Sequence, residues 1–262
     1  MSKANPPTDT LAAYTETTLL GGRVRLLQYA HGLRAGLDAV MVAAGCAARA
    51  GERVLDLGCG TGAAGLCVRA RAGVHLSGVD IQPELVALAR ESAALNGWDA
   101  DFGVADIRDR STIAAGAYHH VVCNPPYLQA GTWSVTPDTV RARQLGKQVG
   151  DATLAEWVEA AHRALKPGGG LSLIHRADHI DKVVAALAAR GFGAIEIWPL
   201  YAHEGEDALR IVIRARKGRK TPATIHPGLV LHETGTEAGG AWRPQAERIL
   251  SGAETLDALS GA

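Results

Sequence analysis

The feature that most limits how this chain can fold is a glycine-rich turn that directly follows a short apolar run. The run covers residues 54–57, and the turn contains Gly58, Gly60 and Gly62. A short apolar run that ends in glycines is typical of a strand buried in a parallel sheet. A helical pattern follows at residues 63–71, so the turn joins a strand to a helix. Small residues there let the backbone approach a ligand closely, and the start of the helix offers free N–H groups.

Strand and helix patterns alternate along the middle of the chain. Further strands are expected at residues 74–79, 101–105, 119–123, 171–175, 194–199 and 208–215. Further helices are expected at residues 83–96, 152–165 and 180–189. Pro83 suits the first position of its helix because its missing N–H has no partner there in any case. This alternation favours a doubly wound α/β sheet.

Shorter segments flank this α/β core. We expect a disordered N-terminus (1–15), an N-terminal hairpin and helix (16–50), the core (51–216) and a C-terminal flank (217–262). The hairpin is expected at residues 18–29 and the following Ala-rich helix at 37–48. The sequence of the flank predicts a last helix near residues 245–250. We expect the flank to form a lid or an edge of the core and not an independent domain.

The charge balance limits the partners that the chain can bind. The sequence has 27 basic and 27 acidic residues, so its formal net charge is zero. A protein that binds long nucleic acid through phosphate contacts alone is usually basic. Any phosphate-binding surface on this chain must therefore be local.

Targeting signals and metal-ligand spacings are absent from the sequence. The first ten residues are polar, and no apolar run approaches the length of a membrane span, so we expect a cytoplasmic protein with no membrane partner. The four cysteines, Cys46, Cys59, Cys67 and Cys123, form no CxxC pair and have no zinc spacing with histidines. We therefore expect reduced thiols and no metal site. The sequence does not indicate an oligomeric state.

Asp56 indicates the charge of the ligand that the glycine turn accepts. The glycines alternate as GxGxG, whereas a dinucleotide-binding turn has the spacing GxGxxG. Asp56 lies at the end of the strand just before the turn. A carboxylate there would repel a pyrophosphate and attract an ammonium group, such as that of a methionine moiety. The turn therefore suits a cationic ligand.

Two more acids follow at the ends of the next two strands. Asp80 ends the second strand, where its carboxylate can accept hydrogen bonds from two ribose hydroxyls. Asp106 ends the third strand and is placed to meet an adenine amino group, with Ile81 and Ile107 as apolar neighbours. Each acid alone could equally be a helix cap, but three at successive strand ends make a ligand site the better interpretation.

This pattern resembles the class I S-adenosylmethionine-dependent methyltransferases. The resemblance covers residues 53–215 and rests on the glycine motif at 56–62 and on Asp80 as the acid of the second strand. It implies a Rossmann-like sheet of seven strands whose last strand is antiparallel. It also implies S-adenosyl-L-methionine as the cofactor.

The tetrapeptide Asn124-Pro125-Pro126-Tyr127 follows directly on the fourth strand and indicates the acceptor. A conjugated amino nitrogen is a poor nucleophile, and it reacts better when acceptors hold both of its hydrogens. The side-chain oxygen of Asn124 and the carbonyl of Pro125 can be those acceptors. The prolines stiffen the turn, and Tyr127 offers a face on which a flat base or amide can stack. The motif resembles that of methyltransferases acting on adenine N6, cytosine N4 or glutamine N5.

Segments outside the core point to a substrate class. Residues 19–23, Gln28, 32–40, 208–214 and 228–232 resemble the bacterial tRNA adenine-N6 methyltransferases that modify the purine just 3′ of the anticodon of a valine tRNA. This resemblance implies tRNA as the substrate. It also implies that Arg34 closes over the cofactor, although Arg34 could equally form a surface ion pair with Asp38.

A dense basic run is the candidate RNA contact. It consists of Arg214, Arg216, Lys217, Arg219 and Lys220 and begins where the last core strand should end. The run could bind tRNA phosphates while the total charge stays neutral, or it could be a solvated loop.

Three other functions stay open. A protein glutamine-N5 methyltransferase shares the tetrapeptide, but it would need a peptide groove and usually has an N-terminal helical domain. A non-catalytic cofactor-binding module would have no need for two acceptors of amide hydrogens. A dinucleotide oxidoreductase is disfavoured by Asp56 and by the glycine spacing.

Overall fold

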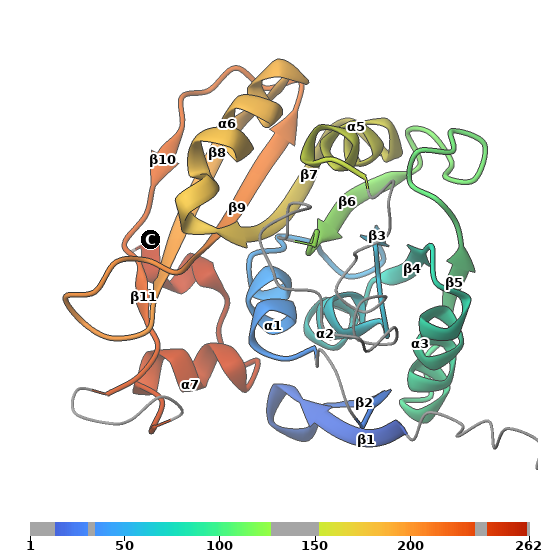
Figure 1. Cartoon of the computed structure of the whole chain (residues 1–262), viewed down its shortest axis with the longest axis horizontal. Helices are drawn as coiled ribbons and strands as arrows, with labels where there is room; N and C mark the ends of the chain where they lie inside the picture. Colours follow the sequence, from blue (N-terminus) through green and yellow to red (C-terminus); the bar gives the residue numbers. More distant parts are fainter. Residues whose placement is uncertain (1–13, 31–34, 127–151, 234–239, 261–262) are drawn as a thin grey trace, which may run out of the picture.

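A mixed β-sheet forms the centre of the computed structural model, which describes residues 14–30, 35–126, 152–233 and 240–260 (Figure 1). The strands of this sheet are β3 (Arg53–Leu57), β4 (His75–Asp80), β5 (Ala100–Val104), β6 (Tyr118–Cys123), β7 (Leu165–Arg176), β8 (Phe192–Tyr201), β9 (Arg210–Lys217), β10 (Thr224–Ile225) and β11 (Leu229–Val230). They lie in the order β10-β8-β9-β7-β6-β3-β4-β5, and β11 also pairs with β8.

The predicted seven-stranded sheet corresponds to β3 through β9. Strands β3 to β7 pair in parallel, whereas β9 is antiparallel to both of its neighbours, β7 and β8. The antiparallel last strand that the family resemblance implied is thereby confirmed. The short strands β10 and β11 extend the sheet beyond the prediction. Each has only two residues, too few to produce a periodic pattern in the sequence.

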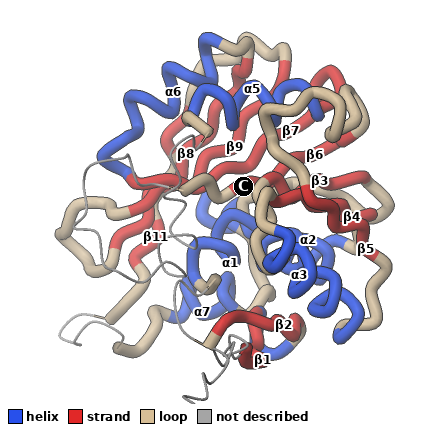
Figure 2. The backbone as a smooth tube through the Cα atoms, turned by 45° about the vertical axis from the view of Figure 1, so that its right-hand side comes forward, coloured by secondary structure: helices blue, strands red, loops and turns tan. Residues whose placement is uncertain are grey.

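Helices cover both faces of the sheet (Figure 2). One face packs against α1 (Leu37–Ala44), α2 (Ala63–Ala72) and α3 (Pro83–Leu95), and the other against α5 (Leu154–Ala164) and α6 (Ile180–Ala189). Within β3, Val54 belongs to the first core and Leu55 to the second. Successive side chains of a strand point to opposite faces, and this alternation supplies both cores from one strand.

Local sequence signals set the ends of several helices. Pro83 occupies the first turn of α3 as predicted. The start of α5 is closed by a capping box, in which Glu156 N donates to Thr153 Oγ1 and Thr153 N donates to Glu156 Oε2. Helix α1 ends at Ala44, before the predicted residue 48. At Gly45, the residue after the helix, an added Cβ would come within 2.7 Å of Val212, so the backbone passes close to β9 at this point.

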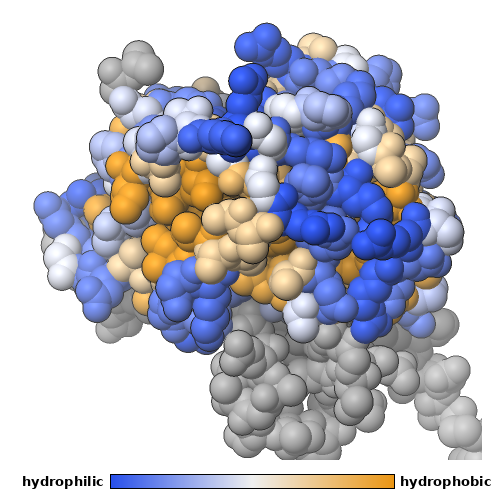
Figure 3. Space-filling model, turned by 90° about the horizontal axis from the view of Figure 1, so that it is seen from above, coloured by the Kyte–Doolittle hydropathy of each residue, from blue (hydrophilic) through white to orange (hydrophobic). Residues whose placement is uncertain are grey.

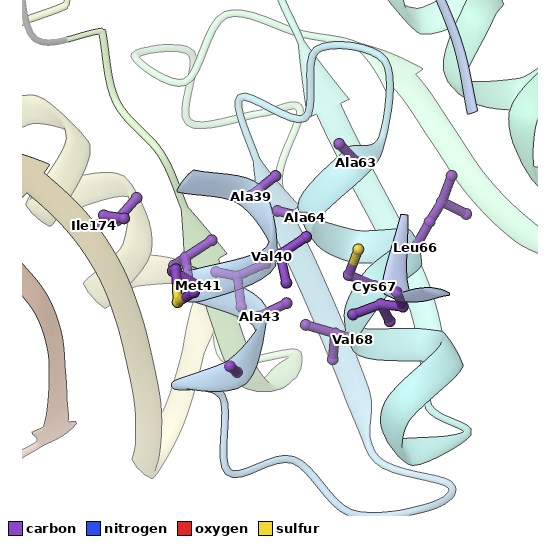
Figure 4. Packing of buried hydrophobic residues seen from close by; sticks show 14 of the residues in the cluster. Ala39, Val40, Met41, Ala43, Ala63, Ala64, Leu66, Cys67, Val68 and Ile174 are labelled. Carbon is purple, nitrogen blue, oxygen red and sulfur yellow. The ribbon is translucent and has the colours of Figure 1, made fainter. Parts of the chain in front are cut away.

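Small side chains let α1 and α2 lie close together. Ala39, Ala43 and Ala64 are buried in the same core, and Figure 4 shows them between the two helices. Alanine at these positions costs little side-chain entropy and allows a short distance between helices. This contact matters for the site, because both helices begin at the edge of the sheet where the glycine turn lies.

The N-terminal hairpin and the C-terminal flank share the core of the α/β domain. The hairpin consists of β1 (Tyr14–Leu19) and β2 (Val24–Tyr29), so it begins before the predicted residue 18. Tyr14 and Thr15 belong to this strand, which corrects the prediction of disorder for them; residues 1–13 lie outside the described residues. Helix α7 (Pro244–Leu250) confirms the last helix and buries Ala246 and Ile249 in the core that contains α1.

On the face of the molecule that Figure 3 shows, hydrophobic residues gather in a patch that hydrophilic residues border. Within the described ranges, no helix is long and apolar enough to cross a membrane.

Candidate active site

A cavity of about 620 Å³ lies at the carboxyl ends of β3, β4, β5 and β6. This is the edge at which open α/β sheets bind their ligands. Of the predicted site residues, its wall includes Asp56, Gly58, Gly60, Asp80, Ile81, Asp106, Ile107, Asn124 and Pro126. The volume lies within the usual range for cofactor sites. Residues from four strand ends thus converge on one space.

The glycines of the turn have different physical roles. All three have positive φ, +70° at Gly58, +53° at Gly60 and +86° at Gly62. An added Cβ on Gly58 would lie 2.2 Å from Trp157, and one on Gly62 would lie 3.2 Å from Phe102. At Gly60 no described atom lies within 4 Å of that position. Gly58 and Gly62 therefore allow close packing, whereas Gly60 leaves the backbone open to the cavity.

Asp80 is held at the cavity by the backbone of two turns. Gly60 N donates to its Oδ2 at 2.8 Å, and Gln82 N donates to its Oδ1 at 3.0 Å. The side chain is 9% exposed, and burial raises the pKa of its carboxyl. Each carboxylate oxygen can accept a second hydrogen bond, so both oxygens stay able to accept from a pair of hydroxyls. A fixed two-oxygen acceptor beside an open glycine backbone fits the ribose of S-adenosylmethionine.

Asp56 is more deeply buried than the sequence alone could show. Gly65 N, in the first turn of α2, donates to Asp56 Oδ2 at 2.7 Å, and the residue is 1% exposed. Burial raises the pKa of Asp56 to about 7, with the nearby charge of Asp80 as a further cause. A cationic ligand at this end of the cavity would stabilise the ionised form. The carboxyl therefore suits the ammonium group that the sequence predicts.

Asp106 has an ion-pair partner that the sequence analysis missed. The Arg108 guanidinium donates from Nε and Nη2 to both Asp106 oxygens, with a shortest contact of 2.6 Å, and this pair lowers the pKa of Asp106. Ile107 is buried, whereas Ile81 is 57% exposed. Asp106 still lines the cavity, but much of its acceptor capacity is taken by Arg108.

Residues 124–127, which the sequence predicts to bind the acceptor amino group, are called the acceptor corner below. Two of them, Asn124 and Pro126, line the same cavity as Asp56 and Asp80. Asn124 follows directly on β6, the strand between β3 and β7, and Pro125 behind it is buried. Tyr127 lies outside the described residues. Because β6 and β3 are parallel neighbours, their carboxyl ends bring Asn124 next to the glycine turn.

Several cavity residues were not predicted as site residues. Among them are Gln28, Tyr29, Asp38, Trp157 and Arg210. Arg210 Nε donates to Asp38 Oδ2 at 3.3 Å, which joins the start of β9 to the first turn of α1. Arg34, the partner of Asp38 that the sequence suggested, lies outside the described residues.

The basic run differs from the prediction in two ways. Arg214 is 8% exposed and donates to Glu196 and Asp257, so it is a buried structural residue and does not offer its charge to a ligand. Lys217 Nζ donates to the carbonyl oxygens of His162 and Leu165 at the end of α5.

The direction of β9 also places the run away from the cavity. This antiparallel strand starts at the cavity with Arg210 and ends at the opposite edge of the sheet, where Gly170 near the start of β7 pairs with Arg216. Arg219 and Lys220 are exposed at that far edge. The predicted phosphate contacts of Arg216, Arg219 and Lys220 stay a prediction.

Comparisons with known proteins agree with this geometry. Residues 39–142 match the family model of the methyltransferase small domain. A tRNA1(Val) (adenine(37)-N6)-methyltransferase of Aeromonas hydrophila is 27% identical over 71% of this chain and 78% of its own length. One of Tolumonas auensis, of the same name, is 30% identical over 61% of this chain and 66% of its own.

Solved structures share the fold. A predicted O-methyltransferase from Agrobacterium tumefaciens superposes with a TM-score of 0.69 at 28% identity, covering 84% of this chain and 98% of that one. A [4+2]-cyclase superposes with a TM-score of 0.50 at 17% identity. The fold therefore supports more than one reaction, and the site must indicate the chemistry.

The strand order, the glycine turn with its strand-end acids and these matches together define a class I S-adenosylmethionine-dependent methyltransferase, and the chain belongs to that class. Within the class, the sequence resembles the tRNA1(Val) (adenine(37)-N6)-methyltransferases.

Proposed function

We propose that this enzyme methylates the exocyclic N6 of an adenine in tRNA, near the anticodon. The observation that carries the proposal is the position of Asn124, which lines one cavity with Asp80 and Gly60. The names of the relatives support tRNA over other amino-group acceptors. A cytoplasmic location, which a tRNA substrate would suit, stays a prediction.

Some residues of the cavity would bind the cofactor, and others would orient the acceptor. S-adenosylmethionine supplies a methyl group on a sulfonium when it is bound. Asp80 would accept hydrogen bonds from its ribose hydroxyls, and the open backbone at Gly60 allows the close approach. The carboxyl of Asp56 would lie nearest to its positive charges.

Asn124 and Pro125 would orient the amino group. The Asn124 side-chain oxygen and the Pro125 carbonyl accept the two N6 hydrogens, which turns the nitrogen lone pair away from the ring plane and toward the cofactor side of the cavity. Proline has no N–H that could compete for these acceptors. The rate gain comes mainly from this alignment, because the proton can leave after the methyl transfer and no general base is needed.

Label transfer to two acceptors tests the proposal. The protein is incubated with labelled S-adenosylmethionine and either tRNA lacking the modification or unmethylated release factor. Label in N6-methyladenosine is expected. Label in methylglutamine would replace the proposal with the glutamine-N5 alternative, which uses the same corner.

Asn124→Ala separates chemistry from cofactor binding. We expect kcat to fall by about two orders of magnitude or more, because an acceptor that aligns the nitrogen is lost. The affinity for S-adenosylhomocysteine, measured by calorimetry, should stay within about threefold. A variant with normal kcat would remove Asn124 from the mechanism.

A further inference from the structure

Gln28 is a buried amide that makes three hydrogen bonds at the wall of the cofactor cavity. The residue is 4% exposed and lies on β2. Ala35 N donates to its Oε1 at 2.6 Å, and its Nε2 donates to Ala35 O at 3.2 Å and to Thr17 Oγ1 at 2.9 Å. One side chain thus binds both backbone groups of a residue seven positions away in the sequence.

The segment that Gln28 holds forms one side of the cavity. Residues 35–39 all line it, and α1 begins within this segment at Leu37. The N-cap of α1 is Gly36, which has no side chain that could cap the helix. The entry to α1 is instead held by the two bonds between Gln28 and Ala35 and by the contact of Asp38 with Arg210.

Only an amide of this length can make all three bonds. Both hydrogens of Nε2 and one lone pair of Oε1 are used. A glutamate would keep the acceptor for Ala35 N but lose both donors. A leucine would leave Ala35 N, Ala35 O and Thr17 Oγ1 without this partner, and unpaired buried polar groups destabilise the arrangement that buries them.

We propose that Gln28 is a positioning residue for the cofactor: by holding Ala35 it fixes residues 35–39 as the cavity wall before the cofactor binds. The hydrogen-bonded segment then loses little conformational freedom on binding, and pre-organisation of this kind increases affinity. The inference concerns the cofactor side of the cavity and does not depend on the identity of the acceptor. The sequence marks Gln28 only as part of the family resemblance and assigns it no role at the cofactor.

The experiment compares two variants of Gln28 with two matched controls. Gln28→Leu removes all three bonds, and Gln28→Glu removes only the donors. Thr17→Val removes one bond of Gln28 but leaves both bonds to Ala35. Ser92→Ala removes a buried bond of similar length, from Leu27 N to Ser92 Oγ at 2.9 Å, which tethers the same hairpin strand to α3.

Two measurements are made on the full chain: calorimetric affinity for S-adenosylhomocysteine, and hydrogen exchange of the backbone amides of residues 35–39 without ligand. We expect Gln28→Leu to weaken binding about tenfold and Gln28→Glu about threefold, each with faster exchange in this segment. Both controls should bind within about twofold of the unchanged protein, even where they lower Tm.

Three outcomes would overturn the proposal. One is unchanged affinity in both Gln28 variants. Another is a loss in Ser92→Ala equal to that in Gln28→Leu, which would mean that any weakening of the hairpin has the same effect. The third is weaker binding in the Gln28 variants with unchanged exchange, which would indicate direct contact between Gln28 and the cofactor. If Gln28→Leu does not fold, Gln28→Glu and the controls decide in the same way.

Discussion

The indole ring of Trp157 lies so close to Gly58 that a β-carbon on the glycine would come within 2.2 Å of Trp157 Cη2. This contact joins α5 to the glycine turn, two elements that are far apart in the sequence. Trp157 also lines the cofactor cavity, so the contact helps to set the shape of the site.

Gly58→Ala should therefore reduce both stability and cofactor binding. The added methyl group overlaps the ring and must adopt φ near +70°, which together should cost about 2–4 kcal/mol in the free energy of unfolding. Gly73→Ala is the matched control. It has φ of +64° and no described atom within 4 Å, so it should cost only about 1 kcal/mol and leave binding unchanged. Denaturant unfolding and calorimetry check both; equal effects in the two variants would contradict the role of the Trp157 contact.

The two acids at the ends of β4 and β5 should differ in their effect on affinity. Asp80→Asn should weaken S-adenosylhomocysteine binding by about tenfold or more, because the charged acceptor for the ribose is lost. Asp106→Asn should have a smaller effect, since Arg108 already engages that carboxylate. Calorimetric titration of both variants gives the comparison. A larger loss at Asp106 would mean that the Arg108 pair opens when the cofactor binds.

Asp56 should make stability depend on pH in an unusual direction for a carboxyl group. Its pKa rises from 3.8 to about 7 on folding, mainly through burial. Between about pH 4 and pH 7 the folded protein keeps a proton that the unfolded chain has released. The stability that this group contributes is thus complete below pH 4 and is lost as pH rises to 7.

Two buried histidines act in the opposite direction, so the test must isolate Asp56. Burial lowers the pKa values of His120 and His175 to about 4, and their contribution to stability rises with pH between about 4 and 6.5. Asp56→Asn removes only the titration of this carboxyl group. Its stability relative to the unchanged protein should increase by a few kcal/mol from pH 4 to pH 7, measured by urea unfolding. Parallel pH curves for the two proteins would show that Asp56 does not titrate in this range.

Arg214 should prove structural, whereas Arg219 and Lys220 are the exposed basic residues of the run. Arg214→Ala leaves Glu196 with one basic partner fewer and should reduce stability by about 3 kcal/mol. Arg219→Ala and Lys220→Ala should leave Tm unchanged because both side chains are exposed. If the run binds phosphate, each of these two substitutions should reduce the salt dependence of tRNA binding. The slope of log K against log salt concentration should become about one unit less steep. Slopes that do not change would place the RNA contact elsewhere.

Short-range patterns in the sequence predicted the central sheet, the glycine turn and the acids at the strand ends. Strand, turn and helix signals lie within a few residues of one another, and the carboxyl ends of parallel strands meet at one edge. Asp56, Asp80 and Asn124 could therefore be assigned to one site from the sequence alone. Arg108 lies only two residues from Asp106, but both are in the turn after β5, where no periodic pattern predicts which side chains meet.

The sequence by itself determined the class of fold and the cofactor, and it predicted which residues hold the acceptor, because each depends on residues at fixed local spacing. Tertiary structure alone decided which distant side chains complete the cavity. Asp38 and Arg210 are 172 residues apart in the sequence, and they meet only because β9 runs antiparallel and starts at the cavity. The same reversal of direction carries the basic run to the far edge, and the position of β9 between β7 and β8 buries Arg214. Strand order and direction are set by the packing of the whole core, which no local pattern contains.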